Sequence, residues 1–161
     1  MSSMNGYASR SERKIAFLIA VVALVATVGF VLFWFAPQGR TSYIEHGIHT
    51  ISDRVASDEA DRYRGLSGVE KLNPNEGLLM VFEAPDRHGI VMRDMKIPID
   101  VVWIDSDGSV VHVEYNMKPD IDPELVYRSR SPALYVLEMG SGEAKRLSIK
   151  VGDKLDIPEE V

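Results

Sequence analysis

Five charged residues stand out because the sequence places them within apolar segments or at the end of a predicted helix. Arg93 and Asp94 interrupt the segment IVMRDMKIPID, Asp100 lies at the start of DVVWI, and Glu138 lies inside YVLEM. Arg64 ends a short segment with helical periodicity. A charge within a buried strand is costly unless it is paired. We therefore expect Arg64 or Arg93 to pair with Asp100 or Glu138 at one rim of a β-sheet.

The cluster of Arg64, Arg93, Asp100 and Glu138 allows more than one interpretation. It is either a structural ion-pair cluster that fixes strand register, or a site that binds a ligand. An enzymatic alternative, a hydrolase, uses Asp100 and Glu138 as acid and base, because two carboxylates can do such work when their environments separate their pKa values. That alternative requires both carboxylates in one concave pocket, about 5–10 Å apart. No residue is assigned a catalytic role.

The remaining motifs do not predict a nucleophile, a metal site or a cofactor. Ser67 in RGLSG lacks the flanking glycines of a nucleophile elbow. The sequence DSDG at 105–108 lacks the glycine and glutamate positions of a calcium loop, and it is typical of a hairpin turn. The four histidines, His46, His49, His88 and His112, have no short metal-binding spacing, and there is no cysteine.

Hydrophobic patterning predicts a mainly β, β-rich α+β domain after residue 40. We expect strands within 43–52 (a pair around Gly47), 78–82, 90–95, 99–104, 109–115, 133–139 and 149–157. Short helices are expected near 56–66 and within 141–147, and a long loop at 116–132. These elements predict a compact, mostly antiparallel curved sheet or open barrel with two short helices.

One uncharged run precedes this domain. Residues 15–36 are 22 residues long, 20 of them apolar, which predicts a transmembrane helix. Arg10, Arg13 and Lys14 lie just before the run, so the N-terminus should be cytoplasmic and the rest extracytoplasmic. A cleaved signal peptide is the alternative, although the run is longer than such a segment usually is. The predicted divisions are 1–14 (cytoplasmic flank), 15–36 (span), 37–51 (linker and first strands), 52–157 (β-rich domain) and 158–161 (tail).

The charge of the chain limits its partners. The net charge of the whole chain is −6, and residues 38–161 hold 15 basic and 23 acidic residues, a net charge of −8. Such a domain repels phosphate, so we expect no nucleic-acid partner. The predicted partners are membrane lipid through the span, and a small ligand or an envelope protein.

The chain resembles the domain of unknown function 192 family (uncharacterised protein family 0127). The resemblance lies in several blocks, from RGLSG through GLLMVFEAPDRHGIVMRDMKIPIDVVWIDSDGSVVHV to PALYVLEMGSGEAKRLSIKVGDKL. Val91 stands where the family usually has tryptophan, and Arg93-Asp94 where it has Lys-Asn. The resemblance implies a compact β-rich domain, often exported or membrane-anchored, with no established activity. The leading hypothesis is a membrane-anchored extracytoplasmic binding or accessory module of the cell envelope, and the sequence leaves open whether it has an enzymatic activity. A purely structural envelope protein is a further alternative.

Overall fold

The computed structural model describes residues 10–34, 40–47, 49–119, 125–159 and 161, with side chains of the first range given for 10 and 14–25. The chain divides into two parts, residues 1–38 and 39–161. The first part holds α1 (Arg10–Trp34), a 25-residue helix. Among the residues described, no helix has both the length and the apolar character needed to cross a membrane. The membrane anchor therefore stays a prediction from the sequence.

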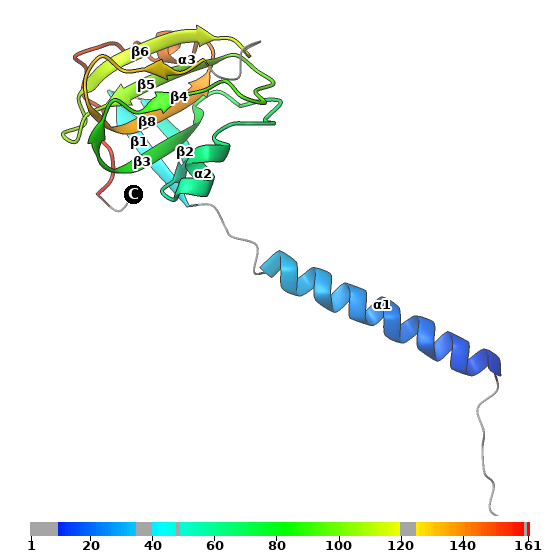
Figure 1. The fold of residues 1–161 in the computed structure, drawn as a ribbon. Helices are drawn as coiled ribbons and strands as arrows, with labels where there is room; N and C mark the ends of the chain where they lie inside the picture. Colours follow the sequence, from blue (N-terminus) through cyan, green and yellow to red (C-terminus); the bar gives the residue numbers. More distant parts are fainter. Residues whose placement is uncertain (1–9, 35–39, 48, 120–124, 160) are drawn as a thin grey trace, which may run out of the picture. The chain divides into compact units, whose positions relative to one another are not determined.

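The second part is built on one mixed β-sheet. Its strands are β1 (Thr41–His46), β2 (His49–Ala56), β3 (Glu76–Asp86), β5 (Ile99–Ile104), β6 (Val110–Met117) and β8 (Ala133–Gly140), in the spatial order β1-β2-β3-β8-β5-β6. A second, two-stranded sheet pairs β4 (Gly89–Ile90) with β7 (Tyr127–Arg128). Figure 1 shows α2 (Glu59–Arg64) beside β2 and β3, and α3 (Glu143–Arg146) near β5 and β6.

The predicted class, a mainly β domain with few short helices, is confirmed, and the sheet is open rather than closed. One pairing differs from the antiparallel expectation, because β2 and β3 run parallel. The connection between them carries α2, and parallel neighbours require a crossover of this kind. The predicted strand at 90–95 is wrong beyond Ile90, since residues 91–98 form turns and irregular backbone. The expected final strand is limited to isolated bridges at Lys154 and Asp156.

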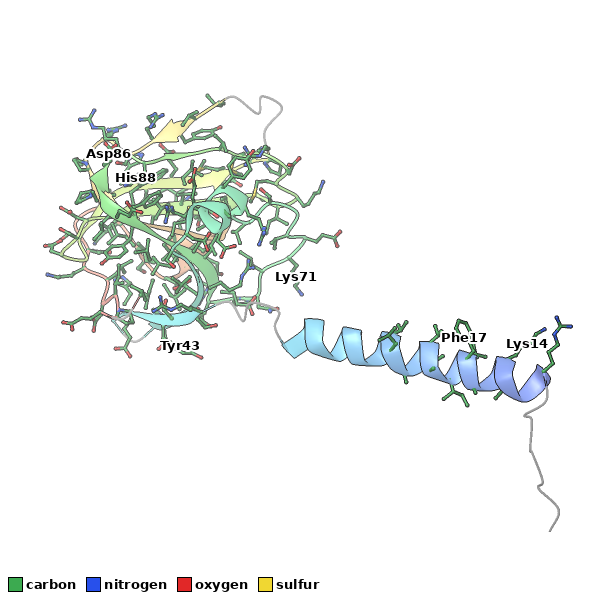
Figure 2. All side chains as sticks on the ribbon, turned by 60° about the horizontal axis from the view of Figure 1, so that its bottom comes forward. Lys14, Phe17, Tyr43, Lys71, Asp86 and His88 are labelled. Atoms are coloured by element: carbon green, nitrogen blue, oxygen red, sulfur yellow. The ribbon has the colours of Figure 1, made fainter. Side chains whose placement is uncertain are left out.

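The sheet buries apolar side chains on both faces, which explains why β5 is buried at all six positions. One face holds a cluster around Trp103, Met80 and Val136, to which Leu66, just after α2, contributes. The other face holds a cluster around Leu79, Leu137 and Met139. Ala144, in α3, and Leu147, just after α3, pack against this cluster. Side chains accordingly lie on both faces of the sheet (Figure 2). Asp86 and His88 lie together at the end of β3, away from Tyr43 in β1 (Figure 2).

The local sequence explains where α2 begins and ends. Asp58 is the N-cap of α2, and its carboxylate accepts a hydrogen bond of 2.8 Å from the Asp61 N–H, as the acidic segment predicts. Gly65 ends α2 with φ 53°, a conformation that glycine adopts without the strain of a side chain. That turn brings the backbone of Gly65 close to β8, next to the buried side chain of Glu138.

Candidate functional site

Glu138 is a buried acid in the middle of the sheet. It lies on β8, paired with Leu78 of β3 on one side and Val101 of β5 on the other. Its side chain is on the face of the sheet that α2 approaches, and a Cβ placed on Gly65 would lie 3.4 Å from its Oε2. The backbone N–H of Leu66 lies near the carboxyl group and lowers its pKa, against the larger effect of burial. Oε2 is buried and has no hydrogen-bond partner among the described residues.

A cavity of about 360 Å³ opens beside this carboxyl group. Its volume is at the lower end of the range for small-molecule sites. The wall is largely apolar, and the polar groups that line it come from α2, the turn after α2, the segment at 89–95, and β8. The lining includes Leu66, Met80, Phe82, Ile90, Met95 and Glu138, together with the arginines Arg62, Arg64 and Arg93.

Two of these arginines, Arg62 and Arg93, are held by backbone carbonyls and aromatic rings. The Arg62 guanidinium donates to the Val81 carbonyl (2.9 Å) and lies 5.2 Å from the centre of the Phe82 ring. The Arg93 guanidinium donates to the Tyr63 carbonyl (2.9 Å) and lies 4.0 Å from the centre of the Tyr63 ring. Among the described residues, neither has a carboxylate within ion-pair distance. The Arg62 guanidinium also donates to the Ser57 carbonyl (2.5 Å). Backbone carbonyls and an aromatic ring therefore hold each guanidinium in position and leave it available to an anion.

The two sides of the cavity are joined by hydrogen bonds. The Ser67 hydroxyl donates to the Arg93 carbonyl (2.9 Å), and the Gly68 N–H donates to the Asp94 carbonyl (3.0 Å). Asp94 has φ 55°, an uncommon conformation for a residue with a side chain. The segment MRD is thus a turn that presents Arg93 to the cavity, rather than part of a strand. Val91 also lines the cavity, so two of the departures from the family pattern fall on its wall.

Asp100 does not belong to this site. Its strand partner is Met139, the neighbour of Glu138, and successive residues of a strand point to opposite faces. One Asp100 oxygen accepts a hydrogen bond from the Asn116 N–H (2.8 Å), and the other from the Gly142 and Ala144 N–H groups (2.9 and 3.0 Å). This carboxylate holds the turn between β8 and α3, so it has a structural role.

Two expectations about the predicted cluster are therefore wrong. The structure brings Arg64, Arg93 and Glu138 to one cavity, but among the described residues neither arginine forms an ion pair with Asp100 or Glu138. Arg64 pairs instead with Asp61 at 3.3 Å, on the exposed side of α2. The hydrolase alternative needs Asp100 and Glu138 in one pocket, and their positions on opposite faces of the sheet contradict it.

Sequence reasoning missed Asp53, a second buried acid without a partner. It lies on β2 and is fully buried, and neither carboxyl oxygen has a hydrogen-bond partner among the described residues. Its strand neighbour is Gly77, where a Cβ would lie 2.4 Å from Asp53 Oδ1, so the missing side chain makes room for the acid. The available signal was the alternation Ile51, Asp53, Val55, which places the acid on the same side of the strand as two apolar residues.

Burial changes the titration of both unpartnered acids. It raises the pKa of Asp53 to about 8, because removal from water disfavours the charged form. It raises the pKa of Glu138 to about 7, although the Leu66 N–H and the positive charge of Arg54 oppose the shift. Near neutral pH the Glu138 carboxyl group can therefore either donate or accept a hydrogen bond.

The described residues offer no obvious metal centre. They contain no group of three or more histidine, cysteine, aspartate or glutamate side chains arranged to hold an ion. His112, on β6, is buried and its Nε2 lies 3.0 Å from Glu114 Oε1. The predicted loop at 116–132 contains β7, and its residues 120–124 lie outside the described part of the chain. The cavity beside Glu138 is accordingly the best candidate site.

We expect the stability of the domain to fall as the pH rises from about 4 to 8. The folded state keeps protons on Asp53 and Glu138 that the unfolded chain releases near its ordinary pKa values of 3.8 and 4.5. Stability is therefore fully present below these values and is lost as the pH rises toward the folded pKa values, by at most about 1.4 kcal/mol per pH unit for each acid. Urea unfolding between pH 4 and 9 measures the slope. The D53N variant should flatten it, and an equally steep slope in D53N would contradict the assignment.

The substitutions D100N and E138Q should have opposite consequences at pH 8. D100N weakens three backbone hydrogen bonds to a charged acceptor and should lower the free energy of unfolding by about 2 kcal/mol. E138Q keeps an acceptor for the Leu66 N–H and removes a buried ionising group, so stability should be equal to or higher than that of the wild type. Chemical denaturation of both variants compares them directly. Equal losses in the two variants would show that Glu138 is as well paired as Asp100.

Comparisons with known proteins agree with the resemblance found in the sequence. Residues 41–157 match the DUF192 family model, described as "Uncharacterized ACR, COG1430". The chain is 30% identical over 111 residues to UPF0127 protein PF1050 of Pyrococcus furiosus, covering 66% of this chain and 86% of that protein.

Two solved structures share the fold. One is a candidate transcription regulator from Sinorhizobium meliloti 1021, with a TM-score of 0.69 and 27% identity, covering 74% of this chain and 95% of that one. The other is a protein of unknown function from Novosphingobium aromaticivorans DSM 12444, with a TM-score of 0.67 and 29% identity, covering 72% and 84%. The match to the family model extends over most of the chain, including every strand that forms the Glu138 cavity. The chain therefore belongs to the uncharacterised DUF192 (UPF0127) family.

Proposed function

We propose that the protein is a binding module whose Glu138 cavity takes a small ligand. The observation that carries this proposal is the carboxyl oxygen Oε2 of Glu138, which is buried at the cavity and has no hydrogen-bond partner among the described residues. Leaving such an atom unpaired costs stability. A ligand with a hydrogen-bond donor at its inner end supplies the missing partner, and the apolar wall receives the rest of the ligand.

Binding is a better proposal than catalysis for this cavity. Acid–base chemistry usually requires a second titratable group placed to exchange a proton with the substrate. The other charged side chains near Glu138 in the lining are arginines, which do not titrate in the physiological range, and Glu59, which is exposed on α2. Asp100 lies on the other face of the sheet. One acid beside an apolar wall therefore favours recognition over turnover.

A ligand screen on the full-length chain tests this proposal. Ligand-observed NMR with a library of small alcohols, amines and amides should find compounds that bind the wild type and lose most of their affinity in E138Q. The loss should be about tenfold, as for a hydrogen bond to a group that can ionise. Glu70 is exposed and outside the cavity lining, so E70Q is a matched control that should bind normally.

A second variant blocks the cavity and leaves Glu138 in place. V91W adds an indole ring at a half-buried wall position, where the family usually has tryptophan, so the fold should accept it. The hits should bind V91W more weakly than the wild type. If no compound distinguishes the wild type from both E138Q and V91W, the cavity is not a binding site.

We also propose that residues 15–36 anchor the protein in the membrane, with residues 39–161 on the extracytoplasmic side. The support is the uncharged apolar run and the basic residues before it. Protease added to intact cells or right-side-out vesicles should degrade the β-rich domain, and the protein should stay in the membrane fraction after a high-salt wash. A full-length chain in the soluble fraction, or a protected domain, would contradict this topology.

We further expect the module not to bind nucleic acid directly. The net charge of −8 on residues 38–161 opposes contact with phosphate. Arg62 and Arg93 lie at a small cavity rather than on a broad basic surface, so their charge is better suited to a small anion.

A further inference from the structure

We propose that the natural ligand is a small monocarboxylate whose apolar chain ends in a hydrogen-bond donor. The inference rests on the proposed function, because it uses the same cavity. It adds a second point of recognition, in which Arg62 and Arg93 bind the carboxylate. Glu138 binds the donor at the other end, and the apolar wall between them contacts the chain.

The arginines support the anionic end of this ligand. Arg62 and Arg93 both line the cavity, and among the described residues neither forms an ion pair. Their guanidinium groups are fixed in advance by carbonyl hydrogen bonds of 2.9 Å and by the rings of Phe82 and Tyr63. Fixed donors lose little conformational freedom when an anion arrives, and a guanidinium matches the planar geometry of a carboxylate.

The other arginines near α2 do not offer the same opportunity. Arg64 lines the cavity but is engaged by Asp61, and its side chain is largely exposed. Arg54 is exposed and does not line the cavity. The available positive charge is therefore concentrated on the two arginines that pack on the aromatic rings.

Glu138 supports the donor end. Its Oε2 is buried and has no hydrogen-bond partner among the described residues. A hydroxyl or an ammonium group can donate to this carboxyl group, whereas a plain alkyl chain leaves Oε2 unpaired. A carboxylic acid without a terminal donor should therefore bind less well than one that has it.

The apolar wall supports a chain between the two ends. Leu66, Met80, Phe82, Ile90 and Met95 line the cavity between the sheet and the segment at 89–95. A volume of about 360 Å³ is sufficient for a short aliphatic chain and small for a drug-sized molecule. The lining thus favours a compact ligand with one charged end.

A matched set of six-carbon probes tests the inference on the full-length chain by calorimetry. The probes are 6-hydroxyhexanoate and 6-aminohexanoate, which have both ends, hexanoate, which lacks the donor, and 1-hexanol and hexylamine, which lack the carboxylate. At least one two-ended probe should bind about tenfold more tightly than each of its one-ended counterparts, because each end contributes a hydrogen bond involving a charged or ionisable group. The hydroxy and amino probes distinguish the two kinds of donor.

Variants assign each end to its partner. R93Q should abolish the gain in affinity that the ligand carboxylate gives, and R93K should keep part of that gain. Arg130 is exposed and lies outside the cavity lining, so R130Q should leave the affinity unchanged. E138Q should instead reduce the advantage that the terminal donor gives. Circular dichroism of each variant checks that it is folded, and R93K provides a conservative change if R93Q unfolds.

The outcomes separate the inference from the proposed function. If 1-hexanol or hexylamine binds in an E138-dependent way, while the carboxylate adds nothing and R93Q has no effect, the cavity binds ligands but the inference is overturned. Carboxylate binding that depends on Arg93 but not on Glu138 also overturns it. If no probe and no library compound binds in a Glu138-dependent way, the proposed function fails as well.

Discussion

The burial of the Glu138 carboxyl group constrains the whole region around it. The group lies in the centre of a sheet whose neighbouring strands contribute Leu78 and Val101, so no adjacent strand residue can neutralise it. The chain turns sharply at Gly65 after α2, and a Cβ at Gly65 would lie 3.4 Å from Glu138 Oε2, so this turn packs directly against the carboxyl group. The turn after α2 and Glu138 both line the cavity, so this contact forms part of its wall.

The three buried acids of the sheet show how differently a carboxyl group can be accommodated. Asp100 accepts three backbone N–H groups and holds a turn, as a buried carboxyl group in a structural role does. Asp53 has no partner among the described residues, and it depends on the missing side chain of Gly77 for space. Glu138 differs from both, because its Oε2 has no partner among the described residues and the residue lines a cavity. This difference in hydrogen bonding distinguishes a candidate recognition group from a structural one.

Much of the architecture could be predicted from local patterns, because each strand and turn has its own signal. The hairpin around Gly47, the strands on either side of Asp105–Gly108 and the N-cap at Asp58 are examples. The parallel pairing of β2 and β3 could not be predicted in this way, since it depends on contacts between distant segments. The strand expected at 90–95 failed for a related reason, because the turn at Asp94 is stabilised by a hydrogen bond from Gly68.

The candidate site was predictable only in part. Glu138, Arg64 and Arg93 could be selected because charges are unusual in or beside apolar segments, and all three line one cavity. The separation of Asp100 from this group could not be inferred. Asp100 and Glu138 look alike in the sequence, and only the strand register places them on opposite faces of the sheet. The sequence gives no signal for Arg62, because it resembles any charged residue on the exposed face of a helix. Its packing against Phe82 joins α2 to β3 and is a tertiary contact.

The titration of Glu138 itself tests the central claim most directly. The side-chain carboxyl carbon of this residue can be followed by NMR in the full-length chain, with E138Q used to assign the signal. Burial beside the cavity without an ion-pair partner predicts a midpoint near pH 7. A midpoint near 4.5, the ordinary value for glutamate, would show that the group is solvated or well paired and would contradict the proposed binding site.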